Sequence, residues 1–103
     1  MSIHLGTGPF LNNKNAIVTG GSRGIGRAIT ESLVHLGANV AFLYRNNDDE
    51  ASKLMNELSN FNKQLMAIKA DVTNEDNVKS AISQVNEKFG SVDILINNAG
   101  ITA

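Results

Sequence analysis

The sequence predicts an α/β fold in which helices cover both faces of a parallel sheet. Short, nearly continuous apolar runs alternate with longer segments whose apolar residues recur at helical spacing. Strands that are apolar along their whole length are typical of parallel sheets buried between helices. A glycine-rich turn also joins the first apolar run to the first helical segment. The expected order is βαβαβαβ, with right-handed crossovers between the strands.

The first strand is expected at Ala16–Val18, because this apolar run ends at Thr19-Gly20-Gly21. The first helix is predicted from the spacing of Ile25, Ala28, Ile29, Leu33 and Leu36. Gly37 follows the last of these residues and is expected to end the helix, as glycine commonly does at helix C-termini.

The remaining elements repeat this alternation. Further strands are predicted at Val40–Tyr44, Leu65–Ala70 and Val92–Ile96, the last of them interrupted by Asp93. The second helix is predicted from Ala51, Leu54, Met55 and Leu58, and the third from Val78, Ala81, Ile82, Val85 and Phe89. Thr73 is the expected N-cap of the third helix, with Asp76 three residues later in an imperfect capping box.

The composition limits the classes of function. The 103 residues are enough for one domain or a piece of one, and a net charge of −1 gives no basic field for nucleic acid. The absence of cysteine excludes disulfides, thiolate metal sites and a cysteine nucleophile. The two histidines, His4 and His35, lie too far apart in the sequence to suggest a zinc site. No secretory signal or membrane-spanning run is recognisable, so a cytoplasmic location is expected.

The turn from Thr19 to Gly26 has the pattern T-G-x-x-x-G-x-G between a strand and a helix. A pyrophosphate bound at a helix N-terminus needs close backbone N–H groups and no intervening side chain. Gly20 would allow the tight turn, Gly24 the approach to phosphate, and Gly26 close packing of helix and strand. The alternative is a purely structural glycine turn. The turn predicts a Rossmann-type dinucleotide site, for which its candidate residues are Gly20, Ser22, Arg23, Gly24, Ile25 and Gly26.

Three motifs in register resemble the short-chain dehydrogenases/reductases. They are Thr19–Gly26, Asp71-Val72 and Asp93–Gly100. The sequence is most similar to bacterial 3-oxoacyl-acyl-carrier-protein reductases, which implies a role in fatty acid biosynthesis, and to related sugar and alcohol dehydrogenases. The resemblance covers residues 14–103, the expected nucleotide-binding half of such a domain, and leaves residues 1–13 as an amino-terminal extension. It implies a truncated doubly wound sheet of order 3-2-1-4, with the ligand crevice between the first and fourth strands.

The resemblance also implies roles for the later motifs. Asp71 would accept a hydrogen bond from the adenine amine, and Val72 would pack on the adenine ring. The alternative, which the other motifs disfavour, is that Asp71 is only a polar residue at the end of a strand. Asn98, Ala99 and Gly100 would border the cofactor ribose, while an asparagine side chain in this segment ties neighbouring strands together.

NADP(H) is the expected dinucleotide. NAD-specific sites usually place an acid at the end of the second strand, where this chain has Tyr44 followed by Arg45. Arg45 and, by resemblance, Arg23 would bind a 2′-phosphate through charge-assisted hydrogen bonds. Asp48 and Asp49 are rival acids, but they are expected to start the second helix. A merely solvated Arg45 remains the alternative.

The resemblance implies a catalytic serine, tyrosine and lysine, and the 103-residue sequence does not contain them in the matching pattern. The single tyrosine, Tyr44, is followed four residues later by Asp48 rather than lysine. No catalytic residue is therefore assigned, and the chain is expected to be the NADP(H)-binding part of a carbonyl reductase that acts on an acyl-carrier-linked or small-molecule substrate. The alternatives are an NADP(H)-sensing module without turnover and a non-functional remnant. A full-length protein is expected to be a homo-oligomer, and the isolated chain to self-associate through its fourth strand.

Overall fold

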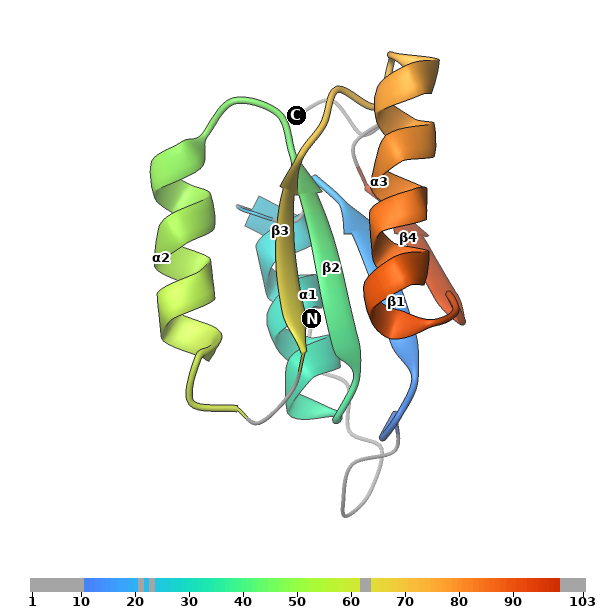
Figure 1. The fold of residues 1–103 in the computed structure, drawn as a ribbon. Coiled ribbons are helices and arrows are strands. Elements are labelled where there is room, and N and C mark those ends of the chain that lie inside the picture. Colours follow the sequence, from blue (N-terminus) through green and yellow to red (C-terminus); the bar gives the residue numbers. More distant parts are fainter. Residues whose placement is uncertain (1–10, 21, 23, 62–63, 99–103) are drawn as a thin grey trace.

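The computed structural model describes residues 11–20, 22, 24–61 and 64–98. Four parallel strands form one sheet in the order β3-β2-β1-β4, and three helices connect them (Figure 1). The strands are β1 (Asn15–Thr19), β2 (Asn39–Tyr44), β3 (Leu65–Lys69) and β4 (Ile94–Asn97). The helices are α1 (Gly24–His35), α2 (Asp48–Leu58) and α3 (Glu75–Phe89). The predicted fold class, element order and strand order are confirmed.

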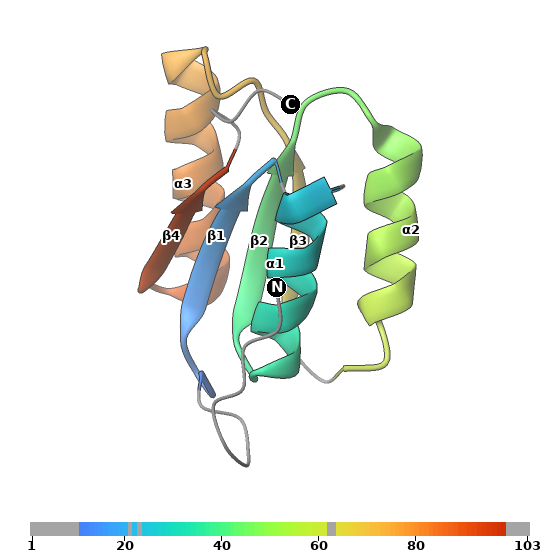
Figure 2. The same cartoon turned by 180° about the vertical axis from the view of Figure 1, so that it is seen from behind.

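The sheet separates two apolar cores, because alternate strand residues point to opposite faces. Val18 and Phe42 belong to the core under α1 and α2, whereas Ile17 and Leu43 belong to the core under α3. Figure 2, seen from behind, places α1 against one face of the sheet and α3 on the other. The middle residues of the central strands β1 and β2 are apolar because each strand supplies side chains to both cores.

Each helix ends or begins at a residue suited to that position. Gly37 has a φ of 97°, and bonds from Gly37 N to Val34 O and from Ala38 N to Leu33 O close α1 in a Schellman motif. This confirms the predicted helix end. Asn47 caps α2 by accepting a hydrogen bond from the Glu50 amide, so α2 begins at Asp48, as expected.

The N-cap predicted for α3 is wrong by one residue. Asn74, not Thr73, caps the helix, with its side-chain oxygen accepting from the amides of Asp76 and Asn77. The Thr73 hydroxyl donates instead to Asp71, 2.6 Å away. Thr73 therefore belongs to the turn that holds Asp71, which places it at the candidate site described below.

A chain of polar side chains joins the strands at their amino-terminal ends. Asn15 is only 6% exposed. Its side-chain nitrogen donates to the Phe89 carbonyl and the Ser91 hydroxyl, and its oxygen accepts from Asn39. The Asp93 carboxylate accepts the Asn15 amide at 2.9 Å. Asp93, which interrupts the apolar run in the sequence, therefore fastens the entry of β4 to β1.

The strand β4 lies at the edge of the sheet and is covered less than the others (Figure 2). Leu95 is 64% exposed, and Ile94 and Ile96 are only partly buried. Within the described ranges, no helix combines the length and apolar character needed to cross a bilayer.

Candidate functional site

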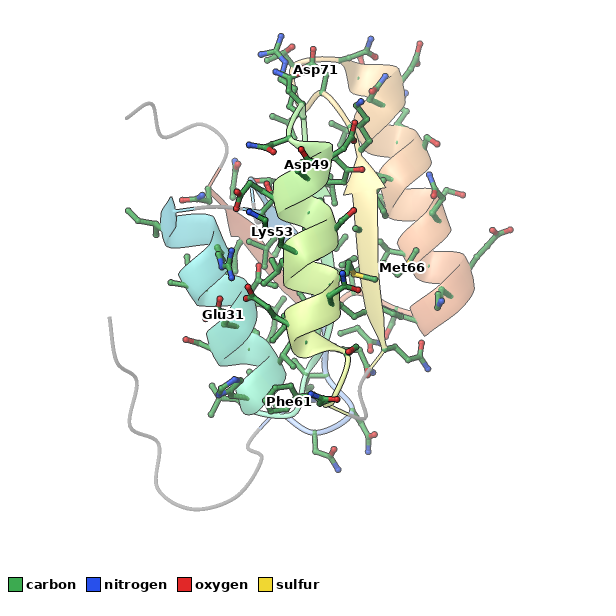
Figure 3. All side chains as sticks on the ribbon, turned by 90° about the vertical axis from the view of Figure 1, so that its left-hand side faces the viewer. Glu31, Asp49, Lys53, Phe61, Met66 and Asp71 are labelled. Atoms are coloured by element: carbon green, nitrogen blue, oxygen red, sulfur yellow. The ribbon has the colours of Figure 1, made fainter. Side chains whose placement is uncertain are left out.

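A cavity of about 860 Å³ opens beyond the carboxyl ends of the strands. Figure 3 shows Asp71 at this end of the molecule, past the tip of β3, and Phe61 at the opposite end. The cavity is lined by Gly20, Ser22, Gly24, Ile25, Leu43, Tyr44, Arg45, Asn46, Asn47, Ala70, Asp71, Val72, Thr73 and Asn98. Ligands of doubly wound sheets bind at this end, where the order of the strands reverses.

The glycines of the turn differ in what makes glycine necessary. Gly20 and Gly24 have φ angles of 66° and 62°, in the left-handed region that favours glycine. A side chain at Gly24 would meet no described atom within 4 Å, so this position is open toward the cavity. At Gly26 an added Cβ would overlap the Gly20 carbonyl and lie 2.8 Å from Asn98 Nδ2. The close packing expected at Gly26 is therefore confirmed.

Hydrogen bonds fasten the turn to the end of β4. The Thr19 hydroxyl donates to Asn97 Oδ1 at 3.1 Å and accepts from the Asn98 amide at 2.9 Å. Asn98 Nδ2 also donates to the Gly20 carbonyl at 3.3 Å. The asparagine tie expected between neighbouring strands is thus made by Asn97 and Asn98 together. It fixes the two walls of the crevice between β1 and β4 relative to each other.

Among the described residues, the last position of β2 is taken by Tyr44 and not by an acid. Tyr44 takes the position where an acid would bind a ribose 2′-hydroxyl, and burial, followed by a hydrogen bond to Asp48, raises the pKa of its phenol. Asp48 in turn lies 3.3 Å from Lys69 Nζ, and Lys69 is the partner of Tyr44 in the ladder between β2 and β3. Asp48 is the first residue of α2, as predicted, and its negative charge is paired with Lys69.

Arg45 and Asp71 form an ion pair beside the cavity, with Arg45 Nη2 and Asp71 Oδ2 3.7 Å apart. The Thr73 hydroxyl and amide both donate to Asp71 Oδ1. These two bonds are the main reason that the pKa of the Asp71 carboxyl lies below its usual value, and Arg45 lowers it further. The turn before α3 is therefore organised around the Asp71 carboxylate.

The cavity gathers most of the predicted site residues. Those that line it are Gly20, Ser22, Gly24, Ile25, Tyr44, Arg45, Asp71, Val72 and Asn98. Gly26 supports the turn from beneath instead, while Arg23, Ala99 and Gly100 lie outside the described residues. The lining residues that sequence reasoning missed are Leu43, Asn46, Asn47, Ala70 and Thr73. Only their position in the sequence could have identified them as lining residues, because each lies near the carboxyl end of β2 or β3.

No group of three or more histidine, aspartate or glutamate side chains is placed to hold a metal ion in the described part of the chain. The cavity instead combines backbone amides at the start of α1, one guanidinium, one carboxylate and apolar walls. Such a set suits an anionic ligand with a flat ring system.

Comparison with known proteins shows which family the chain resembles. The family model for short chain dehydrogenases matches residues 14–103. A 3-oxoacyl-acyl-carrier-protein reductase of Staphylococcus epidermidis is 48% identical over 90 residues, which are 87% of this chain and 37% of that protein. A short chain dehydrogenase from Burkholderia cenocepacia, solved in complex with NADP, is 41% identical with a TM-score of 0.86 over 91% of this chain and 38% of its own.

A blue fluorescent protein from a metagenomic library, solved with NADPH, is 43% identical, with a TM-score of 0.85 over 91% of this chain and 39% of its own. The chain therefore spans less than two fifths of the length of these relatives. The fold, the glycine turn and the family match agree: the chain belongs to the short-chain dehydrogenase family of oxidoreductases.

Proposed function

We propose that this chain binds NADP(H) in the cavity at the carboxyl ends of its strands. The observation that carries the proposal is the end of β2, where Arg45 lines the cavity, Tyr44 takes the place of the usual acid, and Asp48 is paired with Lys69. A guanidinium next to a tyrosine, in place of the acid that usually binds a ribose 2′-hydroxyl, suits a phosphate better than a hydroxyl. The NADP and NADPH complexes of the similar dehydrogenases support this choice.

The residues present fit such a cofactor. The open position at Gly24 leaves room for phosphate beside the first turn of α1, and Val72 offers an apolar wall to a ring. The pyrophosphate would be held by backbone amides of the glycine turn, the adenine by Asp71 and Val72, and the 2′-phosphate by Arg45. In a complete reaction centre, bound NADPH would supply a hydride to a carbonyl carbon.

The second part of the proposal concerns the reaction. The similarity to 3-oxoacyl-acyl-carrier-protein reductases favours a 3-oxoacyl thioester or a related ketone as the substrate. We further propose that the full-length enzyme is a homo-oligomer in the cytoplasm. The 103 residues hold one tyrosine, Tyr44, with Asp48 four residues later. Because no Tyr-x-x-x-Lys pair is present, we infer that this chain binds the dinucleotide without turning it over.

A fluorescence titration tests the cofactor assignment. NADPH is expected to bind more tightly than NADH, and Arg45→Ala should remove most of the difference. A charge-assisted hydrogen bond is worth roughly 10- to 150-fold in affinity. Lys79→Ala, which removes an exposed cation on α3, is the matched control and should leave the ratio unchanged. Equal affinities in the parent chain, or an unchanged ratio in Arg45→Ala, would reject the assignment.

An activity assay tests the inference about turnover. NADPH oxidation by the purified chain with acetoacetyl thioesters and simple ketones should stay at background. Turnover above background would show that these residues contain a reaction centre that the proposal omits.

A further inference from the structure

The carboxylate of Asp71 is held so that one oxygen is occupied and the other faces Arg45. Oδ1 accepts two hydrogen bonds from Thr73, at 2.9 and 2.6 Å. The backbone of Asp71 is fixed as well, because its amide donates to Asn77 Oδ1 and its carbonyl accepts from the Asn74 amide. Asp71 therefore cannot follow Arg45 if the arginine moves, and Oδ2 remains near the cavity.

Arg45 is the more exposed partner of this pair. Its side chain is 68% exposed, against 34% for Asp71, and it extends from the segment after β2 rather than from a strand. Among the described residues that line the cavity, Arg45 is the only cation and Asp71 the only carboxylate. The positive charge available to a phosphate there is thus already engaged by a fixed negative charge.

We propose that Asp71 sets the strength of the NADP(H) preference by competing with the 2′-phosphate for Arg45. This inference rests on the proposed function. A ligand that carries a 2′-phosphate must draw Arg45 from Asp71 and accept a carboxylate nearby, whereas a ligand with a 2′-hydroxyl meets neither cost. The hydrogen bond that the resemblance gives Asp71, to the adenine amine, is common to both ligands and cancels in their ratio. Asp71 is therefore a specificity-determining residue that reduces the preference for a 2′-phosphate over a 2′-hydroxyl, which Arg45 creates.

The size of the effect follows from the exposure of the pair. Ion pairs between solvent-exposed side chains are weak, so releasing Arg45 should change the affinity for a phosphate by roughly 1.5- to 5-fold. Salt screens such pairs, so the effect should shrink at high ionic strength.

The test uses two ligands that differ only in the 2′-phosphate. Adenosine 2′,5′-bisphosphate and adenosine 5′-monophosphate are titrated into the parent chain, Asp71→Asn, Arg45→Ala and the double variant. Asn retains the oxygen that Thr73 needs, so the turn should survive, and thermal unfolding of each variant verifies this. Asp76→Asn, which removes an exposed carboxylate from the first turn of α3, is the matched control.

We expect Asp71→Asn to raise the bisphosphate-to-monophosphate affinity ratio by roughly 1.5- to 5-fold in the parent chain, and by less when Arg45 is absent. A lower or unchanged ratio would overturn the proposal, because Asp71 would then position Arg45 or be irrelevant to it. An equal rise in both backgrounds would also overturn it, since the carboxylate would act on the phosphate without Arg45. If the parent chain does not distinguish the two ligands and Arg45→Ala changes nothing, the proposed function itself fails and this inference falls with it.

Discussion

Gly26→Ala is a sharp test of the packing beneath the nucleotide turn, because helix propensity and packing predict opposite outcomes. Gly26 lies within α1, where alanine normally stabilises a helix by about 0.5–1 kcal/mol relative to glycine. Here the new Cβ would overlap the Gly20 carbonyl oxygen and come within 2.7 Å of its carbon and 2.8 Å of Asn98 Nδ2. These neighbours are backbone atoms and a hydrogen-bonded amide, so α1 must move away from the end of β1.

The cost of such overpacking is about 1–3 kcal/mol, which exceeds the gain in helix propensity. We therefore expect Gly26→Ala to lower the free energy of unfolding in urea, followed by circular dichroism, and to weaken NADPH binding. Ser52→Ala, at an exposed position in α2, provides the matched control and should be neutral or stabilising. If Gly26→Ala is as stable as the parent chain and binds NADPH equally well, the close approach of α1 to the turn is not what this position requires.

Three further predictions concern other parts of the molecule. Asn15→Ala removes three side-chain hydrogen bonds at a buried position and should lower the free energy of unfolding in urea by about 2–3 kcal/mol. The control, Asn86→Ala on the exposed face of α3, should change it little. Equal stabilities of the two variants would refute the role of the polar side chains that join the strands. The phenol of Tyr44, the only tyrosine, should ionise above pH 10.0 in an absorbance titration, and Asp48→Asn should lower the midpoint. Because the pKa of this phenol is higher in the folded than in the unfolded chain, the stability that it contributes is present below the unfolded pKa and is lost as pH rises through the folded pKa. A titration midpoint at or below the ordinary pKa of tyrosine would contradict this. The purified chain should self-associate through the exposed edge of β4, and Leu95→Lys should reduce the associated fraction measured by light scattering. A monodisperse, monomeric parent chain would show that this edge does not cause association.

The sequence was sufficient to predict the fold because its signals are local and repeated. Every strand is a short apolar run and every helix has apolar residues at helical spacing, so all seven elements were expected in the right order. The boundaries were harder to predict. The helix α3 begins at Glu75, before its first apolar residue, Val78, because its first turn is polar and is capped by Asn74. Two adjacent candidates for an N-cap, Thr73 and Asn74, cannot be separated by periodicity.

The site was predictable where a motif lies within one segment, as in the glycine turn and Asp71-Val72. It was not predictable where two segments meet. The ion pair between Arg45 and Asp71 and that between Lys69 and Asp48 depend on how β3 is aligned with β2, which places Tyr44 beside Lys69. That alignment is set by core packing over the whole strand, so no single residue reveals it.

Binding of NADP(H) in the cavity at the carboxyl ends of the strands can be observed residue by residue. The measurement is a titration of the isotopically labelled chain with NADP⁺, followed by its amide chemical shifts. We expect the largest changes at residues that line the cavity, such as Gly20, Arg45 and Asp71, and none at Asn86 on the outer face of α3. Changes centred on α3, or no change at saturating NADP⁺, would contradict it.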